Sequence, residues 1–236
     1  MASIPPTSAE LSALAEFDTP TICNALELLI PESRARGYTT RPAVCGFPAL
    51  KPVVGFARTA RIRARNAPAL GAAEVRELRH AYYRYIDAGP KPSVVLIQDL
   101  DGADAGYGAF WGEVQSAIHR GLGSLGVVTN GSVRDIDQWA AGFQLLAGAI
   151  GPSHAYANLV DFGSEVEVLG MPVRSGDIVH ADRHGAVVVP VQAIRDLPEA
   201  AGRVARREAE ILAVARAPDC TAEKLIAVFK AQDAIH

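Results

Sequence analysis

The chain has 236 residues, of which 49% are hydrophobic and 21% are charged, and its formal net charge is −3. This composition excludes disorder for most of the chain, no apolar run approaches the ~18–20 residues of a membrane span, and no basic field is present to attract nucleic acid. The cysteines Cys23, Cys45 and Cys220 form neither a C-x-x-C pair nor an even disulfide set, which favours a reducing cytoplasm.

The N-terminal part of the chain is predicted to be helical. Residues 1–9 contain two prolines and no basic segment before an apolar one, so we expect a flexible arm and no signal peptide. A first helical pattern begins at Glu10. A second helix is predicted to begin at Thr19, which suits an N-cap, with Pro20 in the first turn, and to end at Pro31.

The middle of the chain alternates between strand and helix patterns. After a connection over residues 31–52, we predict strands at 53–64, 93–100 and 125–129, and helices at 72–86 and 112–122. Asn130-Gly131 is predicted to form a turn, and a further helical piece should begin at Asp137.

The last third changes character. Beyond Pro152 the pattern indicates short strands and tight turns, followed by helices at 191–214 and 221–232. No repeat and no linker is evident, so the economical interpretation is one α/β domain over residues 1–236, with residues 191–236 forming C-terminal helices.

Two segments carry residues suited to chemistry. In the first, Gly112 and Glu113 open a helix whose first amides lack intrahelical acceptors, so they could hold a carboxylate or phosphate. Gly112 would let a ligand approach the backbone closely. The alternative is an ordinary glycine N-cap followed by an acid that the helix dipole favours.

The second segment follows a predicted buried strand. Arg134 and Asp135 come after Gly126 and Gly131, at the carboxyl end of a strand, where α/β sheets usually bind ligands. A guanidinium can bind a carboxylate through two hydrogen bonds, and a carboxylate is a hard ligand for Mg²⁺ or Mn²⁺. The alternative is that Asp135 caps a helix and Arg134 is a surface residue.

These segments together resemble the signature of a known family. The signature is that of the proteins grouped with the regulator of ribonuclease activity A and the 4-hydroxy-4-methyl-2-oxoglutarate aldolases. The resembling residues are Gly112-Glu113, followed by Gly126-x-x-x-x-Gly131-x-x-Arg134-Asp135. Residues 168–190, with Gly176-Asp177 and a second Gly-containing turn, resemble the β-rich part of that family. The likeness covers roughly residues 15–215.

The resemblance implies a layered α/β sandwich with a swivelling β/β/α core and helices at both ends. It also implies a homotrimer or homohexamer with active sites between subunits, and a class II aldolase that uses Mg²⁺ or Mn²⁺. By this likeness, Asp135 would bind the metal directly and Arg134 the substrate carboxylate, while the segment formed by Gly112, Glu113, Val114 and Gln115 would hold the pyruvyl group.

Two further acids are implied as outer ligands of the metal. Glu113 would hold a metal-bound water, and an acid near the C-terminus of a neighbouring subunit would hold another. By this likeness, that acid would be Glu208 or Glu210.

The predicted reaction is cleavage of a 4-hydroxy-2-oxo acid to pyruvate and a second carbonyl compound. The metal would act as a Lewis acid for the enolate, Arg134 would add a cation, and water held by Glu113 could move the proton of the 4-hydroxyl. The same enolate forms when oxaloacetate loses CO₂, so oxaloacetate decarboxylase activity is expected as well. No lysine lies in these motifs for Schiff-base chemistry.

Other functions remain open. One is a non-enzymatic regulator that binds a ribonuclease or another protein, as a member of the family does. A methyltransferase is disfavoured, because no Gly-rich nucleotide loop with a following acid is present.

Several other residues have more than one interpretation. Trp111 is expected to be a packed core indole, although it could narrow the pocket. Asn130 stands where many members of the family carry Asp, and it suits a left-handed turn. The histidines His154, His180 and His184 could form a second metal site, but local hydrogen bonding is the simpler interpretation. The acids Asp99, Asp101 and Asp104 could likewise bind a cation, but a solvated acidic loop is the simpler interpretation.

Overall fold

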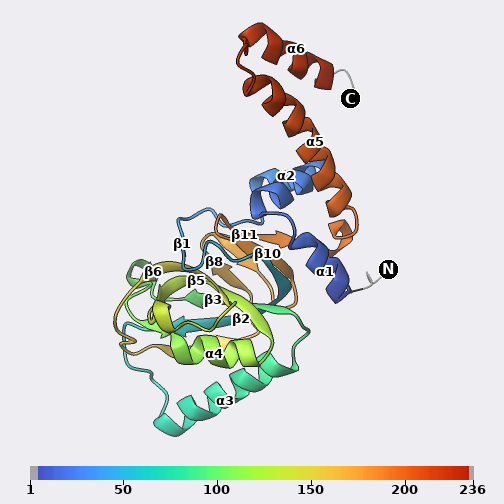
Figure 1. The fold of residues 1–236 in the computed structure, drawn as a ribbon. Coiled ribbons are helices and arrows are strands. Elements are labelled where there is room, and N and C mark those ends of the chain that lie inside the picture. The colour runs from blue at the N-terminus through green and yellow to red at the C-terminus, as the bar shows by residue number, and fades with distance from the viewer. Residues whose placement is uncertain (1–4, 234–236) are drawn as a thin grey trace.

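The protein has a mixed α/β fold built on one large sheet, and the computed structural model describes residues 5–233 (Figure 1). The four parallel strands of the centre lie in the order β6-β5-β3-β2. Their bounds are β2 (Val53–Arg63), β3 (Ser93–Asp99), β5 (Ser124–Val133) and β6 (Gln144–Ile150). The expected α/β class is therefore confirmed.

Shorter strands extend this centre. Antiparallel partners lie along β2 and β6, and β4 pairs with β5 in the parallel sense. A separate hairpin is formed by two strands of three residues each. The bounds are β1 (Val44–Cys45), β4 (Ala109–Trp111), β7 (Asn158–Phe162), β8 (Val166–Val168), β9 (Met171–Val173), β10 (Ile178–Asp182) and β11 (Gly185–Val189).

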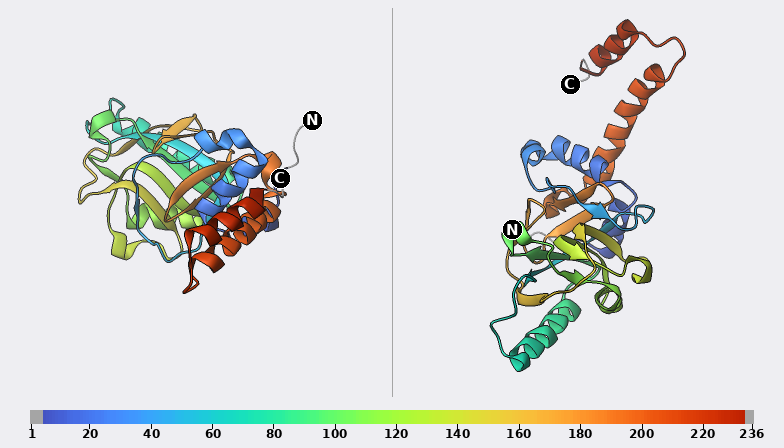
Figure 2. Two further views of the ribbon diagram at one scale, coloured as in Figure 1. Left: turned by 90° about the horizontal axis from the view of Figure 1, so that it is seen from above. Right: turned by 90° about the vertical axis from the view of Figure 1, so that its left-hand side faces the viewer.

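Helices lie at opposite ends of the molecule. α3 (Ala72–Ala88) and α4 (Glu113–Gly121) pack on one side of the sheet, whereas α1 (Ser8–Leu14), α2 (Thr19–Leu29) and α5 (Leu197–Ala215) gather near β10 and β11 (Figures 1 and 2). The last helix, α6 (Ala222–Asp233), lies at the far end of α5. Within the described residues, no helix combines the length and apolar content needed to cross a membrane.

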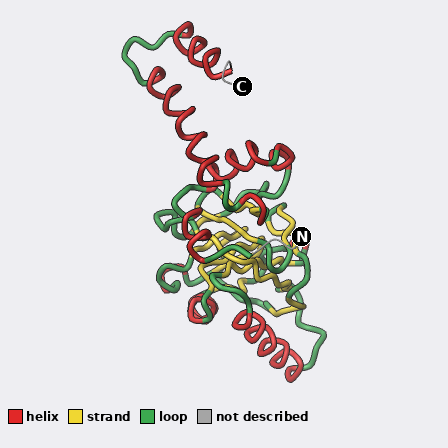
Figure 3. The backbone as a smooth tube through the Cα atoms, turned by 90° about the vertical axis from the view of Figure 1, so that its right-hand side faces the viewer, coloured by secondary structure: helices red, strands yellow, loops and turns green. Residues whose placement is uncertain are grey.

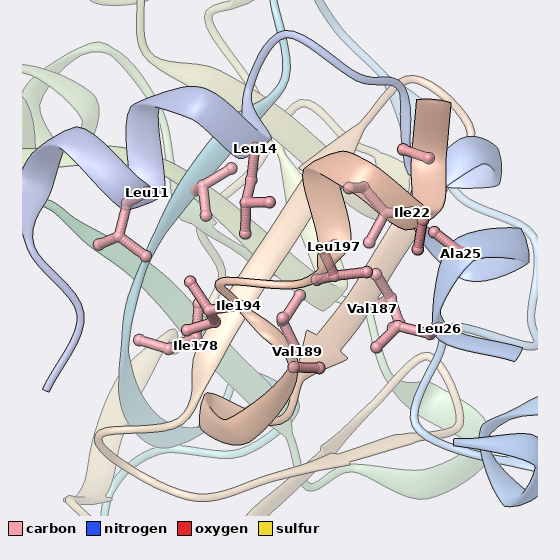
Figure 4. Close-up of a cluster of buried hydrophobic side chains, with 14 residues drawn as sticks. Leu11, Leu14, Ile22, Ala25, Leu26, Ile178, Val187, Val189, Ile194 and Leu197 are labelled. Atoms are coloured by element: carbon pink, nitrogen blue, oxygen red, sulfur yellow. The ribbon is translucent and has the colours of Figure 1, made fainter. Parts of the chain in front are cut away.

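The N-terminal helices are held by an apolar cluster. Leu11, Leu14, Ile22 and Leu26 pack against side chains from β10, β11 and the start of α5 (Figure 4). Burial of several large aliphatic side chains gives about 1.5–3 kcal/mol each, so this cluster is the main attachment of the two helices.

Polar contacts fix where α2 begins. Asp18 is the N-cap, since its side chain accepts a hydrogen bond from the Thr21 amide, so the expectation of Thr19 as N-cap is wrong. The Thr19 amide donates instead to Asp182 Oδ2 at 2.9 Å, and the Thr19 hydroxyl lies 3.0 Å from His180 Nδ1.

Four predicted boundaries require correction. α1 begins at Ser8 with a capping box between Thr7 and Glu10, so the expected arm of residues 1–9 ends earlier; its first four residues lie outside those described. The stretch at 191–214 is interrupted, with a single 3₁₀ turn (Val191–Ala193) before α5. The helical piece expected from Asp137 is also only a 3₁₀ turn, Ile136–Gln138.

The fourth correction concerns β5, which does not turn at Asn130-Gly131 but continues to Val133. The Asn130 side chain takes the place of sheet hydrogen bonds at the end of β3. Its Oδ1 accepts from the Asp99 amide at 2.8 Å, and its Nδ2 donates to the Asp99 carbonyl at 2.9 Å. This reciprocal pair keeps the strand extended and carries Arg134 further along the sheet.

The C-terminal helices form an arm that extends from the body, as the tube view shows (Figure 3). We use "the arm" for α6 and the second half of α5. Ile226 and Phe229 on α6 are about half exposed, at 49% and 48%, and Leu212 on α5 is 40% exposed. Of the α6 residues, only Gln232 is buried.

Candidate active site

The two segments singled out in the sequence meet where β5 ends and α4 begins. The Arg134 amide donates to the Trp111 carbonyl at 3.0 Å, which sets the residue after β5 beside the residue before α4. Gly112 is the N-cap of α4, and its α-carbon faces Asp135. A β-carbon at Gly112 would stand 2.5 Å from Asp135 Oδ2, so any other residue at position 112 would clash with this carboxylate.

The backbone of Asp135 is left-handed, with φ 55° and ψ 40°. This conformation is uncommon for a residue with a side chain and costs on the order of 1 kcal/mol. Asp135 is the N-cap of the 3₁₀ turn, but its side chain makes no capping hydrogen bond. Its Oδ2 lies 3.4 Å from Arg134 Nε, and the carboxylate remains 40% exposed. The alternative of a plain capping aspartate is therefore wrong.

A cavity of about 350 Å³ opens over this pair. This volume lies at the lower end of the range of about 300–1,000 Å³ that is usual for small-molecule sites. Its walls come from α3, β4, α4, the residues after β5 and the segment that leads into β7. The lining residues are Val75, Arg79, Ala109, Phe110, Gly112, Val114, Gln115, Arg134, Asp135, His154, Ala157, Asn158 and Leu159.

The mouth of α4 supplies backbone donors to the cavity. Gly112 O accepts the first helical hydrogen bond, from the Ser116 amide at 3.0 Å. The amides of residues 113–115 come before that bond and therefore have no acceptor within the helix. Together with the helix dipole, they favour an anion at this point.

A buried aromatic cluster fixes α4 in place. Trp111 is fully buried and lies 4.5 Å from His119, ring centre to ring centre, which confirms the expected packed indole. His119 Nδ1 donates to the Gln115 carbonyl at 2.7 Å, and its Nε2 accepts from the Tyr82 hydroxyl at 2.8 Å. Burial lowers the pKa of His119 to about 4, so this link between α3 and α4 is neutral at pH 7.

Two of the predicted acids are not among the residues that line the cavity. Glu113 is exposed in the first turn of α4, next to two lining residues. Glu208 lies on α5 and lines a different groove, between α2, α5 and α6. Glu210 accepts a hydrogen bond from Gln232 Nε2 at 2.9 Å. One chain therefore does not bring Glu208 or Glu210 to Asp135.

The histidines do not form one cluster. His154 lines the cavity, and its Nδ1 lies 2.7 Å from the Ala155 carbonyl. His180 is buried and bonded to Thr19 and to the Leu14 and Phe17 carbonyls, whereas His184 pairs with Asp182. Among the described residues no three His, Cys, Asp or Glu side chains gather as a metal site.

The predicted solvated acidic loop is also wrong for two of its members. Asp99 is buried and accepts from the Asp101 and Gly106 amides, and burial raises its pKa. Asp101 accepts from the Ala64 and Arg65 amides, with only 4% of its side chain exposed. These carboxylates hold the loop after β3 in shape.

Sequence patterns did not predict the three polar residues Arg79, His154 and Asn158 as lining of the cavity. Arg79 follows Val75 by one helical turn, and this i, i+4 pair could have been read from the helical pattern once a ligand was expected beside α3. His154 and Asn158 lie near the start of a strand far along the chain, so only the fold brings them here.

Comparison with known proteins places the chain in a family. The chain matches the family model RraA-like, described as Aldolase/RraA, over residues 19–188. It therefore belongs to the RraA-like family. No curated protein sequence matches it significantly.

Solved structures share the fold at low sequence identity. An uncharacterised protein from Pseudomonas syringae pv. tomato has a TM-score of 0.69 and 21% identity, covering 94% of this chain and 98% of that one. Streptomyces coelicolor RraAS2, titled an unusual member of the RNase ES inhibitor RraA protein family, has a TM-score of 0.67 and 20% identity, with coverage of 87% and 96%. The RNA-processing inhibitor RraA from Thermus thermophilis has a TM-score of 0.51 and 20% identity, with coverage of 70% and 90%.

The donor set around Asp135 fits a hard divalent cation. Mg²⁺ is commonly held by one or two carboxylates and completes its shell with water and substrate oxygens. Asp135 supplies one carboxylate that makes no capping hydrogen bond and pairs only with Arg134 among the described residues, at an open cavity and in a space that a β-carbon at Gly112 would fill. A single carboxylate would leave most of the coordination positions of such an ion to water or to other ligands.

Proposed function

We propose that this RraA-like protein is a divalent-metal-dependent carbon–carbon lyase that cleaves a 4-hydroxy-2-oxo acid to pyruvate and also decarboxylates oxaloacetate. One observation carries the proposal. The carboxylate of Asp135 makes no capping hydrogen bond and lies directly beside Gly112 at the amide-bearing start of α4, in a cavity that Arg134 also lines. A cation ligand, a carboxylate-binding cation and an anion-binding helix end thus surround one small space.

The residues of the chain have separate tasks in this proposal. A Mg²⁺ or Mn²⁺ ion held by Asp135 would supply Lewis-acid stabilisation of the enolate. Arg134 binds the carboxylate of the 2-oxo acid through its guanidinium, and the amides of residues 113–115 orient the same group. Glu113, exposed beside the mouth, accepts the 4-hydroxyl proton by way of a water molecule.

A homotrimer or homohexamer belongs to the same proposal. The arm holds Glu208 and Glu210 away from Asp135 of its own chain and leaves half-exposed apolar residues on α6. If the arm packs on a neighbouring subunit, these apolar side chains become buried, and an acid of the arm can approach the neighbour's cavity. The three cysteines are free thiols, which agrees with the proposed cytoplasmic location.

The direct test measures pyruvate formation from oxaloacetate and from 4-hydroxy-4-methyl-2-oxoglutarate. We expect activity with Mg²⁺ or Mn²⁺ that chelator abolishes, after subtraction of the rate with metal ion alone. Asp135→Asn and Arg134→Gln should each lower kcat/KM by about 100-fold or more. Asp137→Asn removes an exposed acid two residues away that does not line the cavity, and it should retain wild-type activity.

A second candidate is a regulator that binds a ribonuclease, because one structural neighbour is an RNA-processing inhibitor and another is a member of the RNase ES inhibitor RraA protein family. Such a role needs only the surface of the assembly. A protein that releases no pyruvate above background from any of these acids, and yet slows a ribonuclease, would favour this candidate over the lyase.

A further inference from the structure

His154 borders the cavity, but the proposed chemistry gives its imidazole no task. It lies in the loop that leads into β7, far along the chain from the residues of β4 and α4. Among the described residues that line the cavity, four side chains carry a charge or can take one up: Arg79, Arg134, Asp135 and His154. Guanidiniums keep their protons, and a carboxylate that holds a metal ion has given up its own. The imidazole is therefore the lining group suited to pass a proton in either direction.

A backbone contact fixes which nitrogen of this imidazole can react. Nδ1 of His154 lies 2.7 Å from the Ala155 carbonyl, and a carbonyl oxygen only accepts, so Nδ1 carries a hydrogen and donates it. Nε2 has no hydrogen-bond partner in the described part of the chain. Proton transfer is therefore confined to Nε2, and the Ala155 carbonyl supports the imidazolium form, in which both nitrogens carry hydrogen.

The loop that carries this histidine is tied to two strands. The Ser153 carbonyl accepts a hydrogen bond from the Ala109 amide of β4 at 2.8 Å, and the Ala64 carbonyl, just beyond β2, accepts one from the Tyr156 amide at 3.1 Å. Between these two contacts, Ala155 has a left-handed backbone with φ 43°, which is uncommon for a residue with a side chain. The contacts with the strands hold the loop in this conformation and keep the imidazole at the edge of the cavity.

The proposed cleavage contains one proton transfer without a donor. When the C3–C4 bond breaks, its electron pair stays with C3 as the pyruvate enolate, and pyruvate forms only when C3 gains a proton. The same holds after oxaloacetate loses CO₂. Glu113 acts on the 4-hydroxyl group and is not among the lining residues, while Asp135 and Arg134 are assigned to the metal ion and the substrate carboxylate. The donor to C3 must come from another wall of the cavity, and His154 lies on one.

We propose that His154 is the catalytic acid that protonates C3 of the pyruvate enolate from Nε2. This inference rests on the proposed function and adds a step to it. The Nε2–H bond breaks, the C3–H bond forms, and the imidazolium becomes neutral. Because His154 is exposed, it regains a proton from solvent, which receives the proton of the 4-hydroxyl by way of Glu113. In the reverse direction, neutral Nε2 removes a proton from the methyl group of bound pyruvate.

The reverse step provides a direct test. We follow the exchange of the pyruvate methyl hydrogens for deuterium by proton NMR, with the protein and Mg²⁺ in D₂O, and subtract the rate with Mg²⁺ alone. The wild-type protein should catalyse this exchange, and His154→Gln should slow it by about 100-fold, as is usual for the loss of a general acid–base group. His80→Gln is the matched control, because His80 is exposed on α3, does not line the cavity, and should leave the exchange rate unchanged.

A second measurement separates proton transfer from a structural role. The carbon–carbon bond of oxaloacetate breaks before any proton reaches C3. The rate of CO₂ release in a single turnover should therefore fall far less in His154→Gln than the exchange rate does. The inference is overturned if His154→Gln exchanges the methyl hydrogens as fast as the wild-type protein, if both rates fall by the same factor, or if the wild-type protein catalyses no exchange.

The outcomes distinguish this inference from the lyase proposal. If the wild-type protein cleaves and decarboxylates none of the acids, yet exchanges the pyruvate methyl hydrogens in a manner that depends on His154, the lyase proposal fails and the acid–base role of His154 stands. If pyruvate forms in the presence of Mg²⁺ and His154→Gln leaves the exchange unchanged, the lyase stands and the role of His154 is refuted.

Discussion

Gly112 and Asp135 are in such close contact that a β-carbon on the glycine would stand 2.5 Å from Oδ2 of the aspartate. The two residues are 23 positions apart in the chain, and the parallel pairing of β4 with β5 brings them together. The backbone of Asp135 is left-handed, and its carboxylate makes no capping bond. The fold therefore places an available carboxylate directly at the start of a helix.

Gly112→Ala should displace this carboxylate without unfolding the protein. The added methyl group meets the end of a short side chain, so Asp135 must rotate while the strands keep their pairing. We expect kcat/KM for pyruvate formation to fall by about tenfold or more, with a loss of stability below about 2 kcal/mol. Gly121→Ala is the control, since its β-carbon would meet nothing within 4 Å. Equal activity in both variants would contradict the proposed role of this contact.

Asn130→Asp should destabilise the fold, because a carboxylate cannot donate to the Asp99 carbonyl, which now accepts from Asn130 Nδ2 at 2.9 Å. It would also set a negative charge next to the buried Asp99. We expect the free energy of unfolding, measured by urea denaturation, to fall by about 1–3 kcal/mol. Asn24→Asp adds the same charge at an exposed position of α2 and should have little effect. A neutral result at Asn130 would show that the pair does not stabilise the strand.

His119 should make the protein less stable as the pH falls. Its pKa is about 4 in the folded protein, against about 6.5 in an unfolded chain, so between these values the unfolded state binds the extra proton. The contribution of a neutral His119 to the free energy of unfolding is therefore present above pH 6.5 and is lost as the pH falls toward 4. The share that His119 contributes to the loss between pH 7 and pH 5 is about 2 kcal/mol.

The measurement is the free energy of unfolding at both pH values for the wild-type protein and for His119→Gln. The glutamine keeps a polar group opposite Tyr82 but does not titrate. We expect a smaller decrease with pH in the variant. The same decrease in both proteins would show that another group accounts for the pH dependence.

Ile226→Asp should weaken the proposed assembly. Ile226 is 49% exposed on α6 and does not line the groove that α6 forms with α2 and α5. If the arm packs on a neighbouring subunit, a charge at this position should lower the native mass measured by light scattering, while the melting temperature of the body changes little. Ala227→Asp adds the same charge at the adjacent exposed position and serves as the comparison. An unchanged native mass for Ile226→Asp would show that the Ile226 side chain does not contribute to an interface between subunits.

Sequence patterns were sufficient for most of the fold. The predicted second helix matches α2, and the strands β2 and β3 are found close to their expected bounds. These segments carry strong local signals, such as a proline in the first helical turn or an unbroken apolar run. The error at Asn130-Gly131 has a physical reason: the side-chain amide of Asn130 bonds to a neighbouring strand, and local propensity does not contain that contact.

The sequence by itself determined the class of fold and the identities of the residues around Gly112 and Asp135, because apolar periodicity and short motifs are local properties of the chain. Only the tertiary structure decided that the Asp135 carboxylate makes no capping hydrogen bond, that Arg79 and His154 border the same cavity, and that the arm carries Glu208 away from it. These facts depend on which strands pair and on how helices pack across them. Such contacts join residues far apart in the chain, and no spacing along the sequence records them.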